Sequence, residues 1–123
     1  MPDANAHADL RAGEPLRAEQ AHAIAELMQA LAAPSRVRLL YALRDGEHSV
    51  GELAEATAMT PSSASQQLRV LRHLRFVATR REGRATLYRL HDAHVGVLLD
   101  EVHNHLDHAA LGWAAPAPRR ERA

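Results

Sequence analysis

Residues 49–74 constrain the fold most, because two helix starts stand on either side of one short break. Ser49 followed three residues later by Glu52 has the spacing of a capping box, which begins a helix that we predict to reach Thr57. Thr60 then suits the N-cap of a second helix, and Pro61 suits its first position. We therefore predict helices over 49–57 and 61–74, joined by a tight turn.

The second of these helices has two chemically different sides. Its apolar residues recur at helical spacing and are predicted to face inward; they are Ala64, Leu68, Leu71 and Leu74. On the other side, Ser and Gln can read base edges in the major groove, and Arg can read guanine or bind phosphate. This is the helix-turn-helix pattern, with a solvated surface helix as the alternative. The candidate DNA-binding residues are Ser62, Ser63, Ser65, Gln66, Gln67, Arg69 and Arg72.

Two short strand patterns follow at 76–80 and 85–90, with 81–84 as their turn. Gly83 would supply the positive φ that a hairpin turn often needs. A basic hairpin directly after a recognition-type helix is typical of a winged helix. We predict that Arg81 and Arg84, at its tip, contact the DNA backbone or a minor groove.

Two helices are predicted upstream, over 18–32 and 34–44, and both carry apolar residues at helical spacing. Pro34 suits the first turn of the second helix, and we expect Arg36 and Arg38 to lie on its solvated face. The fold class is thus mainly α: a winged helix-turn-helix of five helices and a two-stranded β wing. Residues 17–111 form one domain, and 1–16 and 112–123 are predicted to be disordered tails.

The charge distribution supports contact with DNA although the net charge is zero. Residues 61–90 hold seven arginines against Glu82 alone. The absence of cysteine excludes disulfides, zinc fingers and thiolate metal sites. No apolar run approaches the roughly 18 residues of a membrane span, and the N-terminus lacks a signal-peptide pattern. We expect a cytoplasmic protein without membrane contact.

The final helix, predicted to begin near Asp92, carries a histidine pattern with an unusual gap. His94 and His105 lie eleven residues apart, so they share a helix face but are separated by about 16 Å along the axis. His105 and His108 are one turn apart and can share one ion. Because metal–nitrogen bonds are about 2.0–2.1 Å long, His94 cannot join them within one chain.

A second copy of this helix, running antiparallel, would set Asp92 and His94 of one chain against His105 and His108 of the other. Two-fold symmetry then makes two equal sites, each with three nitrogens and one carboxylate. Asp92 is also a good N-cap, and whether it binds metal or only caps stays open. We interpret His91 and His103 as surface residues, with His91 as an alternative ligand.

The order of elements and three local motifs resemble the ArsR/SmtB family of metal-responsive repressors over about residues 18–110. The motifs are Leu31-Ala32-Ala33-Pro34-Ser35-Arg36, Ser62-x-x-Ser65-x-Gln67-Leu68-x-x-Leu71, and Arg81-Glu82-Gly83-Arg84 with Tyr88. The set Asp92-x-His94 and His105-x-x-His108 is similar to the final-helix site of the family's zinc, cobalt and nickel sensors. The resemblance implies a homodimer that represses its operator when metal-free and leaves DNA when metal binds.

The chain departs from the family pattern at three places, and one of them is Gln66, where many members carry histidine. Ser49 and Gly51 stand where other members carry a cysteine pair, so the family's third-helix site is absent. Arg75 stands where the recognition helix often ends in glycine, so we expect a less comfortable backbone or a different helix end.

Three imidazoles and one carboxylate suit Zn²⁺, and Co²⁺ follows. Ni²⁺ is the alternative, but it prefers more ligands, and these would have to come from His7 or the rest of the N-terminal region. A metal-independent winged-helix regulator is a rival reading. A zinc hydrolase is a second rival, which we reject because four protein ligands leave no open position; we therefore expect no enzyme activity.

Overall fold

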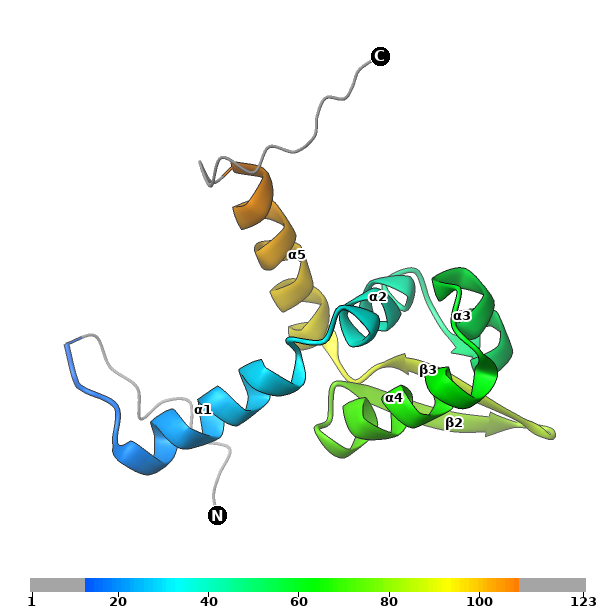
Figure 1. Ribbon diagram of the computed structural model, residues 1–123, viewed down its shortest axis with the longest axis horizontal. Helices are drawn as coiled ribbons and strands as arrows, with labels where there is room; N and C mark the ends of the chain where they lie inside the picture. The colour runs from blue at the N-terminus through cyan, green and yellow to red at the C-terminus, as the bar shows by residue number, and fades with distance from the viewer. Residues whose placement is uncertain (1–12, 109–123) are drawn as a thin grey trace.

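The computed structural model describes residues 13–108, which contain five helices and three strands (Figure 1). In chain order they are α1 (Ala18–Ala30), α2 (Pro34–Ala42), β1 (His48–Ser49), α3 (Val50–Thr57), α4 (Pro61–His73), β2 (Val77–Glu82), β3 (Ala85–Leu90) and α5 (Ala93–His108). All five predicted helices are present, with bounds within about two residues. The predicted tails lie outside the described residues, apart from residues 13–16.

Helices α2, α3 and α4 pack around one small apolar core together with β2 and the first turns of α5. The residues of α4 predicted to face inward are buried, except that Leu74 is only partly covered. The core consists of Leu39, Leu40, Leu43, Leu53, Ala54, Ala64, Leu68, Leu71, Val77, Val95 and Leu99. Within residues 13–108, no helix is both long and apolar enough to cross a membrane.

The two helix starts predicted from the sequence are confirmed. The Ser49 hydroxyl accepts from the backbone N–H of Glu52 at 3.2 Å, and the Glu52 carboxylate accepts from the N–H of Ser49 at 2.9 Å. At the start of α4, the Thr60 hydroxyl accepts from the N–H of Ser63 at 3.0 Å. These caps fix where α3 and α4 begin, and so set the short turn between them.

Two residues other than glycine adopt the left-handed backbone region, one at the end of each helix of this pair. Ala58 has φ 59° and ends α3; Arg75 has φ 66° and follows α4. After α4, the N–H of Phe76 donates to the carbonyl of Leu71 at 2.9 Å, which closes the helix end as a Schellman motif. The expectation of a less comfortable backbone at Arg75 is therefore confirmed.

The predicted two-stranded wing is confirmed as β2 and β3, and a third strand, which was not predicted, joins them in the order β1-β3-β2. Strand β1 pairs antiparallel with β3, with His48 opposite Tyr88. Two residues are too few to show an alternating pattern, and Ser49 was already assigned as a helix cap. Only tertiary pairing with β3 makes them a strand.

The hairpin turn is shorter than predicted. Strand β2 continues through Glu82 and pairs with Ala85, so residues 81–84 are not all turn; only Gly83 and Arg84 lie between the strands. Gly83 has φ 63°, which confirms the positive φ expected there. Arg81 therefore belongs to the end of β2, while Arg84 lies in the turn itself.

Helices α1 and α5 extend away from this body (Figure 1). No residue of α1 is buried, and Met28 on α1 and Val102 on α5 expose 67% and 53% of their surface. An apolar groove of about 460 Å³ runs between α1, α2 and α5. In the single chain these two helices thus leave a continuous apolar surface uncovered.

Candidate DNA-binding and metal sites

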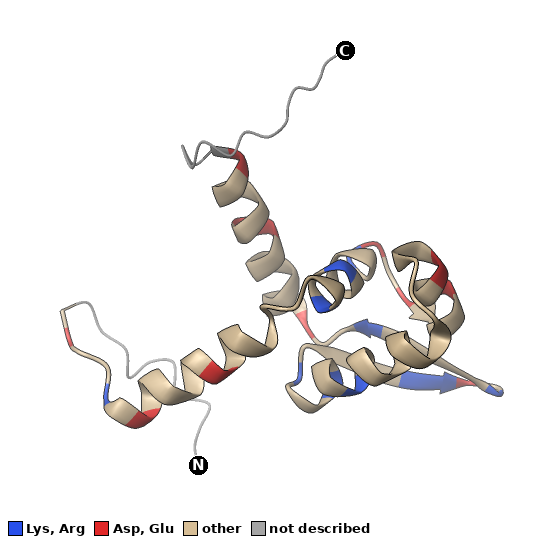
Figure 2. Ribbon diagram, in the orientation of Figure 1, with Lys and Arg blue, Asp and Glu red and all other residues tan. Residues whose placement is uncertain are grey.

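The outer face of α4 carries most of the predicted DNA-binding residues. Ser62, Ser65, Gln66 and Arg69 line one shallow notch of about 270 Å³ on this face. Their spacing of three, four and seven residues places them on one stripe of the helix. Figure 2 shows arginines gathered on α4 and on the wing. On α4, Arg69 and Arg72 are both exposed. This stripe has the chemistry needed to read base edges and contact phosphates.

Gln67 and Ser63 do not line that notch, and both side chains are partly buried. The Gln67 Oε1 accepts from Nε of Arg36 on α2 at 2.9 Å, and Nη1 of Arg36 donates to the carbonyl of Ala30 at 2.6 Å. The expectation that Arg36 lies on a solvated face was therefore wrong. No spacing rule reveals this contact, because it joins positions 31 residues apart on different helices.

The wing carries four exposed arginines, and within residues 13–108 carboxylates hold only Arg80; the others are Arg81, Arg84 and Arg89. Nε of Arg80 donates to Oε2 of Glu47 at 2.7 Å, and Nη2 donates to Oε1 of Glu82 at 2.8 Å. These hydrogen bonds raise the pKa of Arg80 and lower that of Glu47. Arg81 and Arg84 are exposed and form no ion pair within residues 13–108. They remain available to DNA phosphates.

Asp92 is the N-cap of α5, which is one of the two roles expected for it. Its Oδ1 accepts from the N–H of His94 at 2.9 Å and of Val95 at 3.3 Å, while its Oδ2 lies 3.1 Å from Nδ1 of His91. The hydrogen bond from His91, with the backbone bonds, lowers the pKa of Asp92. The carboxylate is therefore ionised at neutral pH, which is also the form that binds a metal ion.

The other candidate ligands lie along the exposed length of α5. The side chain of His94 is 97% exposed, and His105 is exposed as well. His108 is part of α5, but its side chain lies outside the described residues. Among residues 13–108 of one chain, no three His, Asp or Glu side chains gather closely enough to hold a metal.

His103 lies on a different side of α5 from these candidates. Its Nδ1 lies 3.3 Å from Oδ2 of Asp107, and its ring centroid lies 6.3 Å from that of Tyr41 on α2. This histidine therefore faces the body of the same chain.

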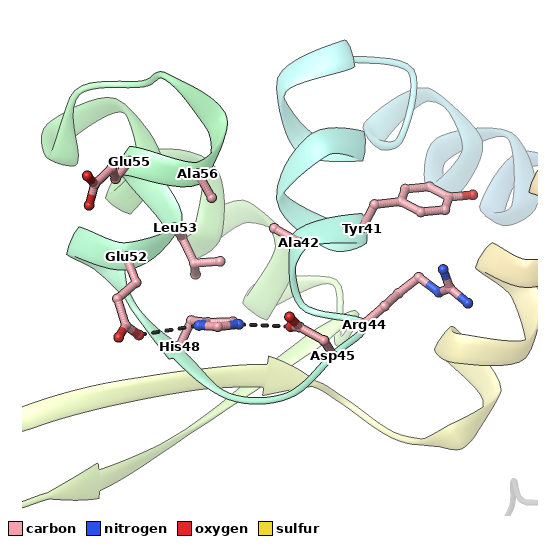
Figure 3. A pocket seen from close by; sticks show the side chains of 9 residues that line it. All are labelled: Tyr41, Ala42, Arg44, Asp45, His48, Glu52, Leu53, Glu55 and Ala56. Carbon is pink, nitrogen blue, oxygen red and sulfur yellow. Dashed lines mark hydrogen bonds and ion pairs between the residues drawn. The ribbon is translucent and has the colours of Figure 1, made fainter.

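A further group of titratable side chains, which the sequence did not single out, surrounds His48 of β1 (Figure 3). His48 Nε2 lies 2.8 Å from Oδ1 of Asp45, and its Nδ1 lies 3.3 Å from Oε1 of Glu52. Only the doubly protonated imidazolium can donate to both carboxylates. The pKa of His48 is accordingly raised, chiefly by the hydrogen bond to Asp45, and the pKa values of both carboxylates are lowered.

The sequence of this chain is similar to those of known transcription regulators. The family model described as bacterial regulatory protein, arsR family, matches residues 33–79. The chain is 47% identical over 108 residues to the HTH-type transcriptional regulator NmtR of Mycobacterium tuberculosis, covering 88% of this chain and 90% of that one. This chain belongs to the ArsR family.

Solved structures of ArsR-type proteins share the fold. The solution structure of apo-NmtR is similar with a TM-score of 0.69 and 44% identity, covering 89% of this chain and 92% of that one. The homodimeric winged helix-turn-helix DNA-binding domain Mb0332 of Mycobacterium bovis is similar with a TM-score of 0.71 and 30% identity, covering 87% and 100%. The predicted winged helix-turn-helix is therefore confirmed, and this ArsR-family chain is a DNA-binding transcription regulator.

Proposed function

We propose that this ArsR-family regulator binds operator DNA in the cytoplasm as a metal-free homodimer and leaves it when zinc, or cobalt, binds to α5. The observation that carries the proposal is the placement of donor residues towards the two ends of one exposed helix. Asp92 and His94 stand at the start of α5, and His105 and His108 stand in its last turns. One chain separates the two pairs, whereas an antiparallel second copy would join them.

The donor set fits a zinc ion. Three neutral imidazoles and one carboxylate match the tetrahedral preference of Zn²⁺, and the low pKa of Asp92 keeps its carboxylate ionised. Bound zinc would supply a cross-link between two copies of α5. Because one oxygen of Asp92 caps the helix, ligation by this residue would leave its backbone bonds intact and engage the side that faces His91.

A second copy is also supported by the apolar surface of α1 and α5. Leu27, Met28, Leu98 and Val102 line the groove between these helices and α2, and all four are exposed in the single chain. Their burial in a dimer would stabilise it by about 25 cal/mol per Å² of apolar surface removed from water. The homodimeric state of the M. bovis domain supports the same assembly.

The DNA-binding surface is proposed to consist of the α4 stripe and the wing tip. Ser65 and Gln66 would read base edges in the major groove, with Ser62 and Arg69 at the ends of the stripe. Ser63 and Gln67 would act by positioning α4 rather than by touching bases. Arg72, Arg81 and Arg84 would contact the DNA backbone or a minor groove, which contributes affinity but little sequence preference.

Two measurements test the proposal. Competition with a chromophoric chelator should show zinc binding tighter than micromolar in the wild-type protein, with loss of binding in His105→Ala. His103→Ala is the matched control on the same helix, and it should keep zinc. Fluorescence anisotropy with a duplex selected by the wild-type protein from a random library should show weaker DNA binding when zinc is present.

The same two assays contain the outcomes that overturn it. Intact zinc binding in His105→Ala would refute the assigned site. Equal DNA affinity with and without zinc would refute zinc as the effector, and equal affinity with cobalt and nickel as well would leave a metal-independent regulator. A response to nickel alone that is lost in His7→Ala would replace zinc by the nickel alternative.

A further inference from the structure

One residue of α2 and one residue of the turn that follows it attach α5 to the DNA-binding body. The Tyr41 hydroxyl donates to the backbone carbonyl of Leu99 at 2.7 Å, and Arg44, just past the end of α2, forms an ion pair with Asp100. The Tyr41 ring lies 6.0 Å from the guanidinium of Arg44 and 6.3 Å from the ring of His103. Figure 3 shows Tyr41 and Arg44 leaving the end of α2 on the same side.

The hydrogen bond from Tyr41 is the stronger of these two contacts. Arg44 and Asp100 are about half exposed, and ion pairs of that kind contribute little because water screens them. Leu99 is buried on α5, and its backbone carbonyl accepts the Tyr41 hydroxyl in a partly buried place. Water therefore screens this hydrogen bond less than it screens the ion pair. The two contacts reach adjacent residues of α5, so they hold this one level of the helix against the end of α2.

The attachment point has a special place relative to the proposed metal ligands. Leu99 and Asp100 stand midway between His94 and His105, and also midway between Asp92 and His108. In an antiparallel pair that sets these residues against one another, the two-fold axis must pass at the level of residues 99 and 100. Any change in the angle between the two copies of α5 therefore turns about the level where Tyr41 holds the helix.

The contact continues from α2 to the recognition helix. Leu39 and Leu40 of α2, and Leu43 at its C-cap, belong to the core. The same core buries Leu68 and Leu71 of α4. Arg36 of α2 adds the hydrogen bond to Gln67. Packed cores transmit a rotation rather than absorb it, since they contain few voids. If α5 rotates and α2 moves with it, α4 must consequently move as well.

We propose that Tyr41 is the positioning residue that couples α5 to the DNA-binding body, so that its hydroxyl sets how strongly metal binding changes DNA affinity. This inference rests on the proposed function, whose metal switch it explains, but it assigns to Tyr41 a role that the metal ligands alone do not provide. The coupling is a difference between two DNA affinities, so it can change while metal binding stays the same.

The test compares Tyr41→Phe with the wild type. The substitution removes the hydroxyl and keeps the ring that packs on His103 and Arg44, so the fold is preserved. Tyr88→Phe is the matched control, because the hydroxyl of Tyr88 makes no hydrogen bond within residues 13–108. The ratio of DNA dissociation constants with and without zinc should fall about fivefold in Tyr41→Phe and stay unchanged in Tyr88→Phe. Zinc affinity should stay within about twofold in both.

Three outcomes decide the inference. A full zinc response in Tyr41→Phe overturns it, and a loss of zinc affinity equal to the loss of coupling overturns it as well, because Tyr41 would then act on the metal site itself. If the wild type responds to no metal, the proposed function fails. Hydrogen exchange in the metal-free protein then decides about Tyr41: faster exchange of the α5 amides around Leu99 in Tyr41→Phe supports the attachment, and unchanged exchange overturns it.

Discussion

Arg36 donates a hydrogen bond from its Nε to Oε1 of Gln67, 2.9 Å away, and so joins α2 to the middle of α4. Its Nη1 donates to the carbonyl of Ala30, the last residue of α1. One guanidinium therefore bridges three helices, including the exposed α1 and the helix proposed to read DNA. A mutation here is expected to change how α4 is held, whereas a mutation on the outer stripe should change what α4 reads.

Gln67→Ala should reduce stability without changing base preference. Loss of its hydrogen bond leaves a charged, partly buried donor without its partner, which costs about 1–2 kcal/mol of the free energy of unfolding. Urea denaturation measures this loss. DNA binding should weaken by a similar factor for every single-base variant of the selected duplex, because no base contact is removed.

Gln66→Ala is the matched substitution at the neighbouring position. Its side chain is exposed, so the free energy of unfolding should change by less than about 0.5 kcal/mol. Discrimination at one base pair should instead fall by about 1–3 kcal/mol. If the two variants exchange these properties, the division of α4 into an outer stripe and an inner contact is wrong.

Arg84→Ala should weaken DNA binding and lower its dependence on salt. Arg84 lies in the wing turn with no carboxylate partner within residues 13–108, so it can neutralise a phosphate. The magnitude of the slope of log affinity against log salt concentration should decrease by about 1 for each protomer. Arg80→Ala provides the contrast, because Glu47 and Glu82 already neutralise Arg80. An equal loss of slope in Arg80→Ala would contradict this distinction.

Stability should decline as pH rises above about 6.5 because of His48. The pKa of His48 is raised in the folded protein, so its contribution is fully present below its ordinary pKa of about 6.5 and is lost as pH rises through the folded value. Asp45 and Glu52 have lowered pKa values, so their contribution is present above about pH 4.5 and is lost as pH falls.

Urea denaturation of His48→Gln at pH 6 and pH 8 tests this assignment. The wild type should lose more stability between these two values than the variant, since glutamine carries no charge to lose. His73→Gln serves as the control, because no ion pair of His73 occurs in the described part of the chain. A variant that keeps the full pH dependence of the wild type would exclude His48 as its source.

Ala58→Gly should stabilise the protein by about 0.5–1 kcal/mol. Ala58 has φ 59°, a conformation that costs an L-residue about 1 kcal/mol and that glycine adopts without a steric penalty. The exposed Ala56 of α3 is right-handed, and Ala56→Gly should therefore destabilise by about 1 kcal/mol. Thermal unfolding of both variants checks the sign, and destabilisation by Ala58→Gly would contradict the assigned backbone.

The candidate metal residues could be proposed from sequence because their chemistry depends on spacing along one helix. An eleven-residue interval separates His94 from His105 wherever that helix lies. The DNA-binding residues were less accessible to this reasoning. Periodicity separates the apolar side of α4 from its polar side, but Gln66 and Gln67 are both polar, and only the position of Arg36 distinguishes them.

Local chemistry alone determined where the helices begin, since a cap is made by residues within three positions of each other, as Ser49 with Glu52 and Thr60 with Ser63. The tertiary structure decided the contacts between distant segments. Strand β1 exists because His48 and Ser49 meet β3, and α5 is held because Tyr41 meets Leu99, 58 positions away. Such contacts depend on how packed helices are placed, and no period in the sequence records that placement.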